Sequence, residues 1–178
     1  MRKFALIIIL SIFTHITMAQ SNTNLIYPEI NNYGGVVKVP SDAFTPITGE
    51  KIVIDIVNGP EDHSALNKDL DRVARLINLY KLSNIAPEQL DIKIVLHGGA
   101  TTLALSDESY KTLLGSQNPN SELMQALLAR GVAFYVCGQS FFRKGYKETD
   151  LHADVDMAVS AMTTLIMLQK EGYQLLIF

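Results

Sequence analysis

The sequence has 178 residues, of which 48% are hydrophobic, and a formal net charge of −3. This length and hydrophobic content suit one domain with a substantial core and exclude a second full domain. The acidic balance argues against nucleic acid or anionic lipid as a partner, because both attract basic proteins. The only cysteine, Cys137, cannot form an intrachain disulfide, and no CxxC motif is available for dithiol exchange.

Residues 1–19 are typical of a secretory signal peptide. Arg2 and Lys3 precede an apolar stretch, 4–13, and small residues lead to Ala19, where a signal peptidase would cleave. The apolar stretch is too short to span a bilayer, so we expect an exported, periplasmic protein without a membrane span after cleavage. Loss of the two basic residues would change the net charge from −3 to −5. A retained anchor of the same length is the alternative.

Residues 20–49 are predicted to form an extended N-terminal arm rather than a domain. Prolines and paired asparagines and glycines interrupt its short apolar pieces at Pro28, Asn31, Asn32, Gly34, Gly35, Pro40 and Pro46. The apolar residues between them could dock on the same chain or on a neighbouring one.

Residues 50–178 alternate between buried strands and amphipathic helices. The β-branched run 52–57 is typical of a parallel strand that is buried on both faces, and apolar residues then recur at helical spacing over 66–80. Further strands are expected at 92–96, 132–136, 155–159 and 173–177, and further helices at 106–114, 121–130, 139–144 and 160–171. The alternation predicts a three-layer α/β/α sandwich with a five-stranded parallel sheet, as in flavodoxin-like folds.

Parallel strands end at the same edge of their sheet, which is where α/β proteins bind ligands. The first three predicted strands are followed by Asn58 and Gly59, by His97 and Gly98, and by Cys137 and Gly138. The glycines would let a backbone or a ligand approach closely, so we expect ligand-binding residues at Asn58, Gly59, Gly98 and Gly138. A simple turn is the alternative, because the glycines match neither a dinucleotide fingerprint nor a P-loop.

Cys137 is the leading candidate for a catalytic residue. A helix that starts just after it would direct N–H groups at the sulfur, and Arg143 would add positive charge, so the thiol should ionise easily. His97 could orient the thiol or accept its proton. Two alternatives stay open: a buried structural cysteine, which is common at the end of an apolar strand, and a histidine that only hydrogen-bonds there.

A metal site is not predicted. His152, Asp154 and Asp156 would share one face of an extended segment, but their spacing matches no familiar ligand set, and a solvated strand edge explains them better. Ser64 and Ser140 lack the partner motifs of acyl transfer.

The domain resembles the DsrE/DsrF-like sulfur-relay family. The resemblance rests on KIVIDIVNGP, VLHGG, VAFYVCGQSFFRKGY and LIMLQKEGYQLLIF, in this order, from about residue 51 to 178. It implies a DsrEFH-like five-stranded sheet, a homo-oligomer (trimer or hexamer), and sulfane sulfur held as a persulfide at the third strand end, where Cys137 lies. It also implies a basic position at Arg143 and a histidine at His97. The well-known carriers of this family work in the cytoplasm, whereas a signal peptide and the arm are extra here.

Two hypotheses about function follow. The first is an exported sulfur carrier of sulfurtransferase type, which needs no cofactor and exchanges sulfur between an unidentified sulfane-sulfur donor and acceptor. The second is a non-catalytic oligomeric module that binds a small ligand or acts as a scaffold, in which Cys137 is structural.

Overall fold

A computed structural model describes residues 24–41, 43–60 and 62–178. Five parallel strands form one sheet: β1 (Lys51–Ile56), β2 (Asp91–Leu96), β3 (Ala133–Cys137), β4 (Val155–Ala158) and β5 (Gln174–Ile177). Their order is β4-β3-β2-β1-β5. The five-stranded parallel sheet expected from the sequence is therefore confirmed. The expected signal peptide, 1–19, lies outside the described residues.

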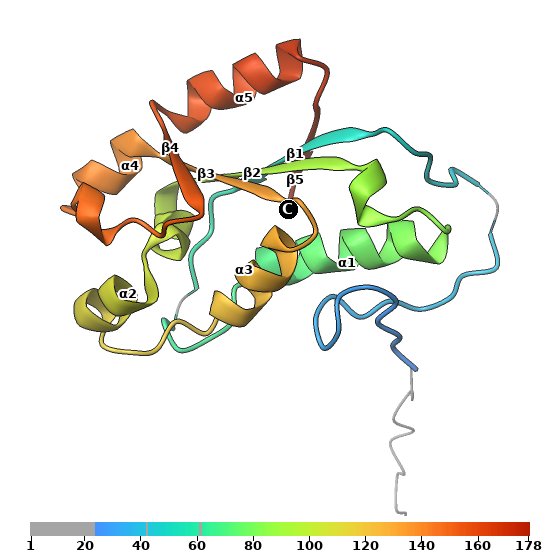
Figure 1. Ribbon diagram of the computed structural model, residues 1–178, viewed down its shortest axis with the longest axis horizontal. Helices are drawn as coiled ribbons and strands as arrows, with labels where there is room; N and C mark the ends of the chain where they lie inside the picture. Colours follow the sequence, from blue (N-terminus) through green and yellow to red (C-terminus); the bar gives the residue numbers. More distant parts are fainter. Residues whose placement is uncertain (1–23, 42, 61) are drawn as a thin grey trace, which may run out of the picture.

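The helices form a layer on each face of the sheet (Figure 1). α1 (Lys68–Leu82) and α3 (Ser121–Leu128) cover one face, and α5 (Ala161–Lys170) covers the other. Right-handed connections that advance from β1 to β4 place their helices on one side, and the return from β4 to β5 places α5 on the opposite side. α2 (Asp107–Leu114) and α4 (Gly138–Arg143) lie near the carboxyl ends of the strands. The three-layer α/β/α prediction is confirmed.

The two faces of the sheet differ in how deeply they are covered. Side chains alternate along a strand, so Ile52, Ile54 and Ile56 pack into the large core under α1. On the opposite face Val53, Val95 and Cys137 pack with α5 in a much smaller cluster. We call this second side the α5 face. Because a single helix covers it, polar strand residues there stay partly exposed.

Residues with a strong preference for helix ends cap the helices. The Ser106 hydroxyl accepts the Ser109 N–H at the start of α2, and Gly115 ends the helix in the left-handed region at φ 78°. The Asn67 side chain caps α1 by accepting the N–H groups of Asp69 and Leu70. Among the described helices, none is long and apolar enough to cross a membrane.

One element was not anticipated. Gly98–Ala104 form a 3₁₀ helix directly after β2, and five of its seven residues are buried. Its small residues show no helical periodicity, because the segment packs on every side rather than along one face. It occupies space beside the strand ends that the sequence alone would leave open for a ligand.

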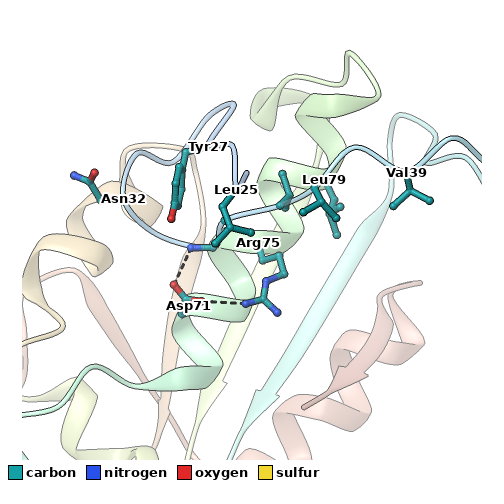
Figure 2. Close-up of a pocket in the computed structure, with 11 residues that line it drawn as sticks. Leu25, Tyr27, Asn32, Val39, Asp71, Arg75 and Leu79 are labelled. Atoms are coloured by element: carbon teal, nitrogen blue, oxygen red, sulfur yellow. Dashed lines mark hydrogen bonds and ion pairs between the residues drawn. The ribbon is translucent and has the colours of Figure 1, made fainter. Parts of the chain in front are cut away.

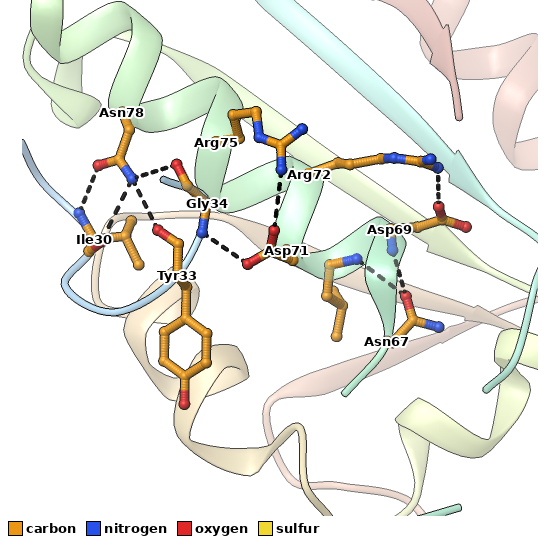
Figure 3. A network of polar contacts seen from close by, with 10 residues as sticks. Ile30, Tyr33, Gly34, Asn67, Asp69, Asp71, Arg72, Arg75 and Asn78 are labelled. Carbon is orange, nitrogen blue, oxygen red and sulfur yellow. Dashed lines mark hydrogen bonds and ion pairs between the residues drawn. The ribbon is translucent and has the colours of Figure 1, made fainter. Parts of the chain in front are cut away.

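The arm docks on its own chain through one buried side chain (Figure 3). Asn78 of α1 is fully buried, and its Oδ1 accepts the N–H groups of Glu29 and Ile30, both at 2.9 Å. Its Nδ2 donates to the carbonyls of Tyr33 and Gly34, both at 3.0 Å. Because buried backbone groups must be paired, these bonds fix the arm on α1.

A close backbone contact and two cations complete this docking. Gly34 has φ +60°, and a Cβ there would lie 2.0 Å from the backbone nitrogen of Arg75, so only glycine fits. The Glu29 carboxylate pairs with Lys81 at 3.0 Å and with Arg130 at 3.3 Å. The hydrogen bond from Lys81 and, more weakly, that from Arg130 outweigh desolvation and hold the pKa of Glu29 below its ordinary value.

Candidate functional site

Cys137 lies at the end of β3, between the amino ends of two helices. It is the N-cap residue of α4, and the first residue of α5, Ala161, is also in contact with its sulfur. The Ser140 hydroxyl and the backbone N–H groups of Ala161, Ser140 and Gln139 lie close enough to the sulfur to stabilise its ionised form. The Cys137 side chain makes no capping hydrogen bond to α4 in the structure, so these four donors act on the thiolate rather than on the neutral thiol.

Burial and these donors together determine the direction in which the pKa of the Cys137 thiol shifts. Burial is the largest single influence and would raise the pKa of Cys137, since a buried thiolate loses hydration. The hydrogen bonds from Ser140, Ala161 and Gln139 together outweigh burial, and the net effect is a lowered pKa. The thiolate is the nucleophilic form of cysteine, so the site favours nucleophilic chemistry.

Access to the sulfur is narrow. Cys137 is 5% exposed, and it packs against Val95 and Ala161. Gly138, the next residue, lines a small hollow of about 360 Å³ between α4 and the end of β4. A Cβ on Gly138 would lie 3.0 Å from the Ala158 carbonyl oxygen, so this glycine allows the close packing of α4 on β4.

His97 is held by an acid on the neighbouring strand. Its Nε2 lies 2.8 Å from Oδ1 of Asp55 in β1, and the two side chains are 26% and 14% exposed. Asp55 stands two residues after Val53, and His97 stands two residues after Val95, so both side chains lie on the α5 face. The pair is therefore half-buried on the side of the sheet where Cys137 lies.

Strand register places His97 next to Cys137. The last pair between β2 and β3 is Leu96 with Val136, so each of the two residues stands one position further along neighbouring strands. Both keep an extended backbone, with φ −152° at His97 and φ −66° at Cys137. Parallel strands lie about 4.8 Å apart, so the backbones of the two predicted residues are neighbours at this edge of the sheet. His97, like Arg143, is not among the groups that shift the pKa of Cys137.

Arg143 lies at the opposite end of α4 from Cys137. It is the last residue of α4, its side chain is exposed, and it is not among the groups that shift the pKa of Cys137. The lowering of the Cys137 pKa comes from hydrogen-bond donors, and the expected effect of Arg143 on the thiol stays a prediction. A direct contact between Arg143 and a substrate stays a prediction.

The glycines after β1 and β2 are explained by packing. A Cβ on Gly59 would lie 2.5 Å from the Gly99 carbonyl oxygen, and Gly98 has φ +55°. The two loops thus need glycine in order to touch. Asn58 and Gly59 line a separate hollow of about 370 Å³ at the start of α1, which Gly98 and Gly138 do not line. Their expected roles as one ligand site stay predictions.

A third hollow, an open groove, lies on the opposite side of the sheet from Cys137 (Figure 2). It has a volume of about 520 Å³ and is bounded by the arm and by α1, with Leu25, Tyr27, Val39 and Leu79 on its walls. Asp71 crosses its floor, where it accepts the Gly34 N–H at 2.7 Å and pairs with Arg75 at 3.5 Å. Its lining includes no cysteine, serine, threonine or histidine, and neither Cys137 nor His97 lines it.

The histidine before β4 makes a local hydrogen bond, in which Nδ1 of His152 accepts the Asp154 N–H at 3.1 Å. Within 24–41, 43–60 and 62–178, no group of three or more histidine, cysteine or acidic residues could hold a metal ion.

Sequence analysis did not assign a role at the site to three residues, Asp55, Ser140 and Ala161. Asp55 did leave a signal, because it is the one charged residue inside the apolar run of β1. Ser140 lies in the helix that follows Cys137, but its bond to the sulfur depends on how that helix turns. Ala161 left no signal, since its N–H reaches the sulfur only because α5 crosses back over the sheet.

Comparison with known proteins agrees with this architecture. A family model described as the DsrE/DsrF-like family matches residues 51–178. Two solved structures are similar: the protein of unknown function MTH1491 from Methanobacterium thermoautotrophicum, with a TM-score of 0.55 and 19% identity, and the ychN protein from E. coli, with 0.53 and 22%. Each comparison covers 72% of this chain and 99% of the other. No curated protein gave a significant match. The chain belongs to the DsrE/DsrF-like family.

Proposed function

We propose that this protein is a sulfur carrier that holds sulfane sulfur as a persulfide on Cys137. The observation that carries the proposal is the position of Cys137, which ends β3 and precedes the first residue of α4, where nearby hydrogen-bond donors lower the pKa of the thiol. Membership of the DsrE/DsrF-like family is consistent with a sulfur-relay function. The expected persulfide position, at the third strand end, coincides with this activated thiol.

The same donors serve both halves of a relay. In loading, the thiolate attacks the outer sulfur of a donor R–S–SH, an S–S bond to Cys137 forms, and the thiolate R–S⁻ leaves. In delivery, an acceptor nucleophile attacks the outer sulfur of the persulfide, and the Cys137 thiolate is the leaving group. Groups that stabilise this thiolate therefore favour both its attack and its departure.

We propose a homo-oligomer that forms through the α5 face. Large apolar side chains, which are usually buried away from water, are exposed on α5 and close to it: Val159 (79%), Met162 (75%), Ile166 (55%), Met167 (54%) and Ile177 (62%). Apolar patches of this kind mark interaction surfaces. A second copy of the chain is the partner that the family resemblance implies. The trimer or hexamer expected from the sequence remains part of this proposal.

Export to the periplasm also remains a proposal, because it rests on the pattern of residues 1–19 alone. In that compartment the donor and the acceptor of sulfur would have to be exported molecules or small sulfur compounds. The acidic net charge of −3 is unfavourable for nucleic acid.

One observation favours a second candidate function. Cys137 is only 5% exposed and packs in the small core of the α5 face. A structural cysteine in an oligomeric binding or scaffold module would have this environment. Such a thiol would react only after unfolding.

A loading experiment separates the two. Purified mature protein and a Cys137→Ser control are incubated with polysulfide or thiosulfate, and intact masses are recorded before and after cyanide or a thiol reductant. A carrier gains one or more sulfur atoms, reversibly, and the control gains none. No gain in the native protein would refute the proposal and would favour the structural cysteine.

A further inference from the structure

We propose that His97 is the proton-transfer residue of sulfur exchange at Cys137 and that Asp55 is its positioning residue. The inference rests on the proposed function and names the groups that serve it. It starts from Asp55 on β1, from His97 directly after β2, and from Cys137 at the end of β3, which the strand register places on the α5 face.

The Asp55 carboxylate fixes the state of the imidazole. A carboxylate oxygen 2.8 Å from Nε2 accepts a hydrogen bond, so the neutral ring carries its proton on Nε2. Nδ1 is then the unprotonated nitrogen, and it has no hydrogen-bond partner among the described residues. A ring in this state can accept a proton and later return it.

Burial makes the arrangement more than a surface ion pair. The Asp55 side chain is 14% exposed in a strand whose other interior residues are apolar. A partly desolvated carboxylate needs a partner, and the histidine supplies one without becoming part of the hydrophobic core. The His97 backbone N–H also donates to the Ile56 carbonyl at 3.1 Å, which holds the residue against β1.

The exchange balances without an oxidant. The Cys137 thiol gives its proton to Nδ1 of His97, and the thiolate attacks the outer sulfur of R–S–SH. The bond between the two donor sulfurs breaks, its electron pair stays on R–S, and this leaving group takes the proton from His97. The products are Cys137–S–SH and R–SH, and both His97 and Asp55 return to their initial states.

The test uses leaving groups that differ in their need for a proton. The single cysteine of the chain is reacted with a dialkyl disulfide, whose leaving thiolate is strongly basic, and with an activated aromatic disulfide, whose leaving thiolate is weakly basic. The measured quantity is the ratio of the alkyl rate to the aromatic rate. A general folding defect would change both rates by a similar factor and leave the ratio unchanged.

Two variants and one control are compared with the native sequence. His97→Gln keeps an amide N–H for Asp55 but cannot transfer a proton, and Asp55→Asn removes the carboxylate. We expect the ratio to fall by about 10²-fold in His97→Gln, at the lower end of general acid–base effects, and by about tenfold in Asp55→Asn. Asp156→Asn removes an exposed carboxylate from the same face, on β4, and should leave the ratio unchanged.

The outcomes distinguish this inference from the proposed function. If the native protein gains sulfur from polysulfide but both variants keep the native ratio, the assignment of His97 and Asp55 is wrong and the carrier stands. If the native protein gains no sulfur, the carrier itself is refuted, whatever the ratio.

Discussion

Ser140 offers a sharp test of how the thiol is activated. Its hydroxyl is the one side-chain donor among the four groups that stabilise the Cys137 thiolate, so it can be removed without a change to the backbone. Ser140→Ala leaves three N–H donors and the same burial. Since burial raises the pKa and the donors lower it, loss of one donor must move the pKa of Cys137 upward.

The size of the effect follows from the bond that is lost. A hydrogen bond to a charged group contributes about 1.5–3 kcal/mol. Three other donors share the sulfur and can partly compensate, so we take the lower value, about 1.5 kcal/mol, which corresponds to roughly tenfold less thiolate below the pKa. We therefore expect alkylation by iodoacetamide to slow about tenfold at such a pH and to recover at a pH where the thiol is fully ionised.

The chain contains one cysteine, so alkylation reports on Cys137 alone. Ser140→Thr keeps the hydroxyl and serves as the matched control, with a pH profile close to that of the native protein. The reasoning is refuted if Ser140→Ala and Ser140→Thr give the same profile as the native protein, because the hydroxyl would then contribute nothing to the thiolate.

Three further predictions follow from the arm and the α5 face. Asn78→Ala leaves the N–H and carbonyl groups of residues 29–34 unpaired, and should lower the free energy of unfolding in urea by more than about 2 kcal/mol; a loss below about 0.5 kcal/mol would show that Asn78 does not hold the arm. Ile166→Glu places a charge on the exposed apolar face and should yield a smaller species by light scattering, whereas Leu113→Glu, an equally exposed site on α2, should not. The lowered pKa of Glu29 means that its stabilising effect is present at neutral pH and is lost as the pH falls through that lowered pKa, so Glu29→Gln should be less stable than the native protein at neutral pH and equally stable in strong acid; a constant difference across this range would contradict the assignment.

The sequence predicted the order of the elements well, because strong periodicities mark them. The β-branched run of β1 and the apolar stripe of α1 are long enough to be unambiguous, and Gly115 marks a helix end by its backbone chemistry. The position of Cys137 at a strand end follows from the same patterns. Its ionisation could be predicted only in direction.

The rest of the site depends on tertiary contacts that no local pattern encodes. The Ala161 N–H lies near the sulfur because α5 returns across the sheet, and Arg143 lies at the opposite end of α4 from Cys137. Gly59 packs closely against Gly99 in another segment, and this contact between distant parts of the chain has no local sequence pattern. Asn78 organises the arm from a helix 44 residues away from Gly34, a relation that only the folded chain shows.

The most direct test of the carrier is delivery of the bound sulfur. Protein loaded with polysulfide is freed of excess donor and mixed with a small thiol acceptor, and the intact mass of the protein and the persulfide formed on the acceptor are followed together. The account predicts that the protein loses its added sulfur at the rate at which the acceptor gains it, with the native fold intact. A sulfur that stays on Cys137 until the protein is unfolded would contradict the account, because a carrier must release what it holds.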